Sequence, residues 1–146
     1  MAALDKTYEA FEKPGLLQNY KVSNVKIFKG SLVGVNASGF LVSMAHGTAN
    51  LKFVGVAGET VDNSAGSAGD KSLNVIRSAS FVYKPASGFV PAQADIGKEV
   101  YANTDWEVQI STSGLTTQYK VGRICALETT STGASGVRIR IDDYAQ

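Results

Sequence analysis

The sequence is poor in residues that crosslink, ligate metals or catalyse. Its 146 residues include one cysteine, one histidine and three prolines. With a single thiol, Cys125, no internal disulfide can form, so the fold does not depend on crosslinks and a reducing compartment is acceptable. Cys125 lies in an apolar, strand-like run, where we expect it to be a small buried hydrophobic residue.

An excess of one charge and long apolar runs are also lacking. The chain has 14 basic and 13 acidic residues, a net charge of +1. Proteins that grip nucleic acid usually carry a basic excess, so we expect no nucleic-acid partner. No apolar run approaches the roughly 18 residues of a membrane span. The N-terminus has no basic segment followed by an apolar stretch, so we also expect no signal peptide.

What the sequence does contain is 15 glycines and many short β-branched runs separated by Gly, Ser, Asn and Asp. This pattern is typical of strands joined by turns. It predicts one compact, all-β, barrel-like domain with few short helices. We expect strands at about residues 21–28, 31–35, 40–44, 51–57, 73–76, 80–84, 99–102, 106–110, 119–127 and 137–141.

Local patterns refine this expectation. Residues 137–141 alternate three apolar residues with two arginines, which predicts a strand with one solvated face. Residues 36–39, Asn-Ala-Ser-Gly, predict a hairpin turn, because Asn and Gly tolerate positive φ. Residues 64–70 and 129–136 are small and polar, and we expect them to be mobile loops.

The N-terminal segment differs from the rest. Leu4, Tyr8 and Phe11 recur at the spacing of one helix face, and Pro14-Gly15 would end such a helix. A helix this short is marginal alone. We therefore predict that residues 1–19 form an arm, either disordered or held by a partner, and that residues 20–146 form the β-rich domain. The alternative, that these side chains pack on their own domain, stays open.

No pattern indicates an active site. His46 would have to serve any Ser-His or Cys-His pair, yet no serine lies in a nucleophile elbow, and we expect a solvated loop histidine. Gly69-Asp70-Lys71-Ser72 and Gly97-Lys98-Glu99 lack the glycine spacing of a phosphate loop and are interpreted as turns. Asp142-Asp143 is interpreted as a solvated strand end. We expect no enzymatic activity, cofactor or metal.

Trp106 and the six tyrosines raise one other function. Aromatic faces stack on sugars, so a β-sandwich carbohydrate-binding module is an alternative, although aromatic residues in strands are more often core or interface residues. Sugar binding predicts exposed aromatic side chains around Trp106.

The order of several weak motifs indicates a family. Residues 25–35 (VKIFKGSLVGV) lead to Phe40-Leu41-Val42, then to residues 53–57 (FVGVA). Residues 97–102 (GKEVYA) and 119–126 (YKVGRICA) follow, and residues 137–141 close the series. Over residues 25–141 this order resembles the capsid cement, or head decoration, proteins of tailed phages. The Val-Gly pairs at 54–55 and 121–122 also suggest two strands in related places.

The resemblance implies a compact β-tulip or barrel-like fold and a non-enzymatic structural function. It implies a protein that binds the major capsid protein on the outer surface of the assembled head, stabilises it, and is often a homotrimer. Its location would be the virion surface, and the host cytoplasm during assembly. In lambda-type decoration proteins an N-terminal arm orders on the capsid, which would make Leu4, Tyr8 and Phe11 capsid-binding residues. A tail-tube or head-completion protein is the alternative within the same broad class.

Overall fold

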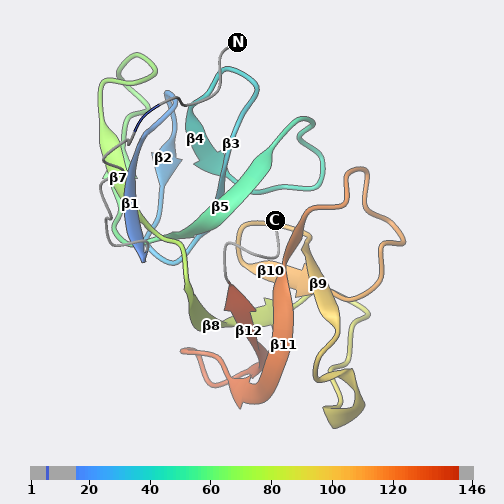
Figure 1. Cartoon of the computed structure of the whole chain (residues 1–146). Helices are drawn as coiled ribbons and strands as arrows, with labels where there is room; N and C mark the ends of the chain where they lie inside the picture. The colour runs from blue at the N-terminus through green and yellow to red at the C-terminus, as the bar shows by residue number, and fades with distance from the viewer. Residues whose placement is uncertain (1–5, 7–15, 142–146) are drawn as a thin grey trace.

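A computed structural model describes Lys6 and residues 16–141 and confirms the all-β fold class. Figure 1 shows two groups of strands, one above the other. The first is a five-stranded sheet in the order β1-β7-β5-β3-β4. Its strands are β1 (Leu17–Lys21), β3 (Leu32–Val35), β4 (Leu41–Ser43), β5 (Lys52–Ala57) and β7 (Ser72–Ile76). A small separate pair joins β2 (Lys26–Ile27) to β6 (Val61–Asp62).

The second group is a closed barrel in the order β10-β8-β12-β11-β9. Its strands are β8 (Ala79–Pro85), β9 (Glu99–Ala102), β10 (Glu107–Gln109), β11 (Lys120–Thr129) and β12 (Ser135–Ile141). A short 3-10 helix, η1 (Gln93–Asp95), precedes β9. Within residues 16–141, no helix is long and apolar enough to cross a membrane.

The sheet and the barrel share one core. Buried side chains of the sheet and of its adjoining loops pack in the same cluster as the inward-facing residues of the barrel. The sheet side contributes Leu32, Met44, Leu51, Phe53 and Val56, and the barrel contributes Tyr83, Val100, Ala102, Val108, Val121, Ile124, Val137, Ile139 and Ile141. Because apolar area removed from water drives folding, this common cluster binds the two groups into one domain.

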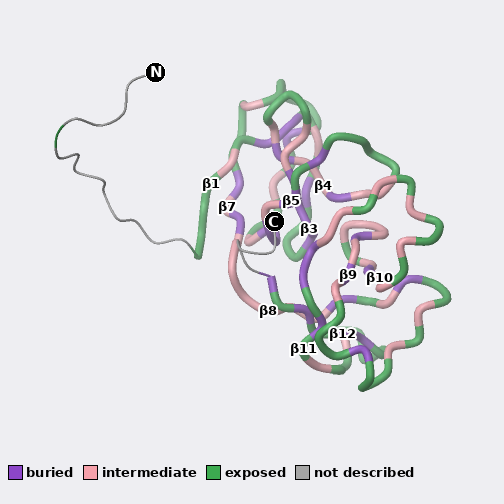
Figure 2. Tube along the Cα trace, turned by 45° about the vertical axis from the view of Figure 1, so that its right-hand side comes forward, coloured by how far each residue is buried: buried purple, intermediate pink, exposed green. Residues whose placement is uncertain are grey.

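A second cluster lies within the sheet half of the molecule. Its buried members are Val22, Ile27, Val33, Leu41, Ala57, Leu73 and Val75. Val22 also forms a parallel bridge to Leu41, which brings the end of β1 against β4, at the opposite edge of the sheet. Figure 2 shows the buried segments concentrated on the strands of both groups and the exposed ones in most connecting loops.

The expected strands lie close to the observed ones, with corrections at the N-terminal end. The predicted strand at 21–28 is divided between β1 and β2, and β6 was not predicted. Residues 17–19, which we assigned to the arm, belong to β1 and pair with β7. The side chains of β1 are mostly exposed, so backbone hydrogen bonds hold this edge strand and no apolar alternation marks it.

Two local patterns are confirmed. In β12, Val137, Ile139 and Ile141 are buried while Arg138 and Arg140 are exposed, as alternation along a strand requires. Residues 36–39 connect β3 to β4 as a hairpin: the Asn36 side-chain oxygen accepts hydrogen bonds from the backbone N–H groups of Ser38 and Phe40, both at 3.0 Å.

Of the two loops expected to be mobile, the first contains several hydrogen bonds. Asn63, itself buried, donates from its amide to the carbonyl of Ser67 at 2.9 Å, and Asp70 accepts from the Ser67 N–H at 2.9 Å. The second loop is shorter than predicted, because β11 continues to Thr129 and β12 begins at Ser135.

The two Val-Gly pairs have the same local structure. At Val54-Gly55 the register of β5 against β3 shifts by one residue, and at Val121-Gly122 the register of β11 against β9 does the same. Both are β-bulges, which bend a strand. A Cβ on Gly55 would collide with the Ile76 carbonyl, and a Cβ on Gly122 would collide with the Arg140 carbonyl. Glycine is therefore required by close backbone approach at both places.

The barrel bulge should be sensitive to a single added methyl group. Gly122→Ala should lower the free energy of unfolding by about 1–3 kcal/mol, because β12 must move to admit the Cβ. Gly47→Ala is the control, since no atom lies within 4 Å of its Cβ position. The control should leave stability unchanged or raise it by less than about 1 kcal/mol. Urea unfolding measures both, and equal stabilities for the two variants would contradict the close approach.

Candidate functional site

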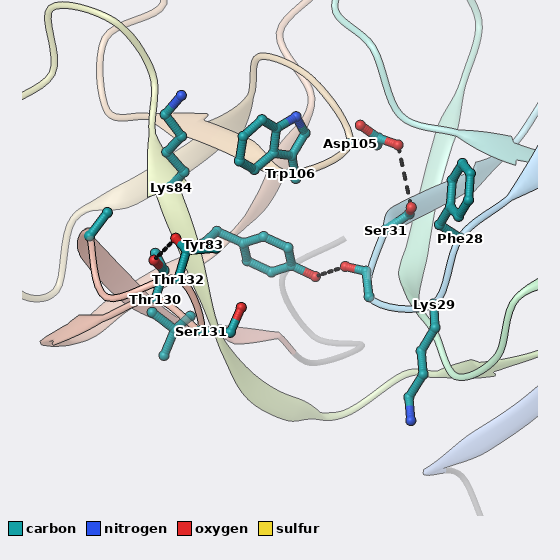
Figure 3. A pocket seen from close by; sticks show the side chains of 13 residues that line it. Phe28, Lys29, Ser31, Tyr83, Lys84, Asp105, Trp106, Thr130, Ser131 and Thr132 are labelled. Atoms are coloured by element: carbon teal, nitrogen blue, oxygen red, sulfur yellow. Dashed lines mark hydrogen bonds between the residues drawn. The ribbon is translucent and has the colours of Figure 1, made fainter.

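A hollow of about 520 Å³ lies where the sheet meets the barrel. Four segments far apart in sequence form it: the β2–β3 loop at residues 28–31, the β8 residues 82–84, the β9–β10 loop at residues 105–106, and the β11–β12 hairpin at residues 130–134. In Figure 3 Trp106 and the hydroxyl side chains of the hairpin lie near Tyr83, and Phe28 lies on the opposite side of the view, beyond Ser31.

Hydrogen bonds between the two groups of strands fix the geometry of this hollow. The Tyr83 hydroxyl of β8 donates to the Gly30 carbonyl at 2.7 Å. The Leu32 N–H donates to the Asp105 carbonyl at 2.8 Å. The buried Ser31 hydroxyl bonds the Asp105 carboxylate at 3.3 Å. The loops that line the hollow are therefore held by the same residues that connect the sheet to the barrel.

Tyr83 stays a hydrogen-bond donor over the whole physiological pH range. Burial of its ring raises the pKa of the phenol far above its ordinary value, and the nearby carboxylate of Asp105 raises this pKa further. Both effects oppose the charged phenolate. The hydroxyl is therefore protonated when it donates to the Gly30 carbonyl.

Two aromatic side chains at the hollow are exposed. Trp106 is 53% exposed and Phe28 is 57% exposed. The Lys84 ammonium lies 4.8 Å from the centre of the Trp106 ring, and the Lys26 ammonium lies 4.9 Å from that of Phe28. These cation–π contacts help to hold the rings in place.

The hydroxyl groups of the hollow come mainly from the β11–β12 hairpin. Thr130 and Thr132 share a hydrogen bond of 2.9 Å between their Oγ1 atoms, and Ser131 between them is exposed. A backbone bond of 2.8 Å from the Thr130 N–H to the Ala134 carbonyl closes this turn. The hairpin thus presents a short row of hydroxyl groups on a well-bonded turn.

A second hollow of about 750 Å³ lies on the barrel side. Its lining is mainly apolar and includes Pro85, Phe89, Val90 and Pro91 beside Leu127. Val90 is 85% exposed and Leu127 is 40% exposed. Exposed apolar groups gathered in one place are typical of surfaces that contact another protein.

The residues considered for nucleophilic chemistry have backbone contacts instead. His46 lies in a turn, as predicted, and its Nδ1 accepts a hydrogen bond from the Thr116 N–H at 3.1 Å. The prediction that Cys125 is buried is wrong: its thiol is exposed and lies 3.4 Å from the Arg138 carbonyl. Alternation along β11 directs Ile124 into the core, so the next side chain points outward.

The remaining candidates fall into two groups. Gly69-Asp70-Lys71 and Gly97 lie in turns and bends, as predicted, but Ser72 and Glu99, also assigned to these turns, begin β7 and β9. Gly97 follows η1 rather than opening a helix. Leu4, Tyr8, Phe11 and Asp142-Asp143 lie outside the described residues. Across residues 16–141 there is no group of three or more His, Cys, Asp or Glu side chains that could hold a metal ion.

Trp106 was singled out from the sequence, Tyr83 only as one of six tyrosines, and Phe28 and Asp105 not at all. Phe28, Tyr83 and Asp105 come from separate segments, and no spacing in the sequence relates them. The one signal in the sequence is that Asp105 is adjacent to Trp106 in a short polar stretch. Comparison with protein-family models, with curated proteins and with solved structures found no match for the chain.

The link between Tyr83 and Gly30 generates a stability prediction. Tyr83→Phe should lower the free energy of unfolding by about 0.5–1.5 kcal/mol, because it removes one hydrogen bond and leaves the Gly30 carbonyl without that donor. Tyr101→Phe is the control, since the Tyr101 hydroxyl has only a 3.5 Å contact to Glu99. Chemical denaturation of the two variants tests this, and a Tyr83→Phe protein as stable as the control would refute it.

Proposed function

We propose that the protein is a non-enzymatic decoration protein of a tailed-phage head. It binds the major capsid protein on the outer surface of the assembled head and stabilises it there. The motif order that resembles this family supports the proposal, and so does the all-β fold of the domain. His46 and Cys125, the residues considered for nucleophilic chemistry, make backbone contacts on separate elements.

The observation that carries the proposal is the place where the N-terminal segment joins the domain. β1 is an edge strand of the five-stranded sheet, and Leu17 pairs with Ile76 at its beginning. Leu16 and Leu17 are 64% and 52% exposed, and in the described sequence the first fully buried side chain is Val22. A segment attached at such an edge can contact another protein without disturbing the core.

This attachment suits a capsid-binding arm built on Leu4, Tyr8 and Phe11. Ordering an arm costs conformational entropy at the moment of binding. Burial of each apolar side chain returns about 1.5–3 kcal/mol when it is fully covered. About 15 extended residues also span on the order of 50 Å, enough to reach a neighbouring capsid subunit. Many such contacts on one head would act together, because multivalent attachment multiplies weak binding.

We predict that deletion of residues 1–15 weakens capsid binding without lowering the stability of the domain. The deletion ends before β1, so the melting temperature of the free protein should be nearly unchanged. Binding to heads that lack the protein should weaken at least tenfold in co-sedimentation. Tyr8→Ala with Phe11→Ala should weaken it as well, whereas Lys6→Ala, an exposed position off the apolar stripe, should not. Unfolding of the shortened chain, or undiminished capsid binding, would exclude the arm.

We further propose that the protein is a homotrimer and that the apolar hollow around Val90 and Leu127 contributes to the subunit contact. A subunit interface needs exposed apolar surface, and this hollow supplies it next to Phe89 and Pro91. A tail-tube or head-completion protein would need similar contacts, so the capsid experiment distinguishes these functions.

The trimer has its own test. Val90→Lys should shift the sedimentation coefficient from trimer to monomer, because a buried ammonium without a partner is costly at an interface. Ile96→Lys is the matched control, since Ile96 is 46% exposed and lies in neither hollow. Analytical ultracentrifugation of both variants, with and without heads, gives the result. A wild-type protein that is monomeric in both settings refutes the trimer.

A further inference from the structure

The hollow between the sheet and the barrel is lined by exposed aromatic side chains and hydroxyl groups that have no role in the capsid-binding proposal. We propose that it is a saccharide-binding site, with Trp106 and Phe28 as the stacking surfaces and with Ser31, Asp105 and the hairpin hydroxyls as the polar contacts. This site is additional to the N-terminal arm and does not depend on the decoration function.

The aromatic side chains provide the first argument. A sugar ring presents weakly positive C–H groups on its face, and the electron-rich face of an aromatic ring attracts them. Trp106 and Phe28 remain 53% and 57% exposed, although burying such large rings would stabilise the fold. A lysine ammonium lies over one face of each ring at less than 5 Å and helps to position it, so a sugar would stack on the opposite face.

The polar groups provide the second argument. A saccharide carries several hydroxyl groups, each of which both donates and accepts hydrogen bonds. The Asp105 carboxylate receives one bond from Ser31 and has the capacity to accept more. Ser31 is 6% exposed and Asp105 is partly buried, so the hydrogen bond between them lies at the edge of the hollow. Thr130, Ser131 and Thr132 add hydroxyl groups that can take either role.

Charge and size favour a saccharide over an anionic ligand. Lys29 and Lys84 line the hollow, but the Lys84 ammonium is paired with Glu107 at 3.3 Å. A phosphate placed among these groups would face the carboxylate of Asp105 at close range, which is unfavourable. The volume of about 520 Å³ lies within the range of roughly 300–1,000 Å³ that is usual for small-molecule sites. The space suits a short, neutral oligosaccharide segment.

The test uses the full chain on an array of bacterial cell-surface glycans together with maltotriose, cellotriose and triacetylchitotriose. We expect the wild-type protein to retain at least one glycan, and Trp106→Ala and Phe28→Ala each to lose at least tenfold in binding. Ile96→Ala, an exposed apolar position outside the hollow, should bind as the wild type does. Both aromatic side chains are exposed, so neither substitution should unfold the protein, and circular dichroism verifies this.

The single tryptophan gives a second, independent readout. Because Trp106 is the only indole in the chain, its fluorescence reports on this hollow alone. Titration with a glycan retained on the array should shift the emission to shorter wavelength with saturation. The inference is overturned if the array retains no glycan, if Trp106→Ala retains it equally well, or if the emission does not respond. None of these outcomes alters the capsid-binding result, which depends on residues 1–15.

Discussion

The structure depends on the burial of one apolar cluster between the five-stranded sheet and the barrel. Leu32, Met44 and Phe53 belong to the sheet and its loops, whereas Val121 and Ile139 belong to the barrel, yet all lie in the same cluster. A five-stranded sheet and a five-stranded barrel of this length would each be small alone, and small domains bury too little surface to be stable. Each half therefore gains stability from the apolar surface that it buries against the other.

The hollow at the junction follows from this arrangement. The loops at residues 28–31 and 105–106 and the β11–β12 hairpin approach one another at the junction and leave the hollow between them. β8 serves both purposes: the ring of Tyr83 lies in the shared core, and its hydroxyl reaches the β2–β3 loop at the edge of the hollow. A residue that stabilises the junction thereby also fixes the position of the groups beside Trp106.

The strands were predictable because their signal is local. Alternation identified β12, and the Asn-Gly spacing identified the β3–β4 turn. β1 was missed because an edge strand is held by backbone pairing, and its exposed side chains carry no period-two pattern. The outward direction of Cys125 was also missed, since an apolar run does not reveal which of its residues face the core.

The hollow was less predictable than the strands. Trp106 could be chosen from its residue type alone, but Phe28 and Tyr83 reach it only through tertiary contacts between residues more than 50 positions apart. The repeated Val-Gly pair was predictable only in part. The sequence indicated related strands, and the structure shows the physical reason: a bulge at each place and a neighbouring carbonyl that leaves no room for a Cβ.

The position of β12 has a consequence for how the protein folds during synthesis. It is the last of the described strands, yet it lies between β8 and β11 in the barrel. Until β12 leaves the ribosome, β8 and β11 have no partner along these edges, and the apolar face of the sheet remains exposed to water. The barrel can therefore close only after β12 has been translated, whatever β1 to β7 have already formed.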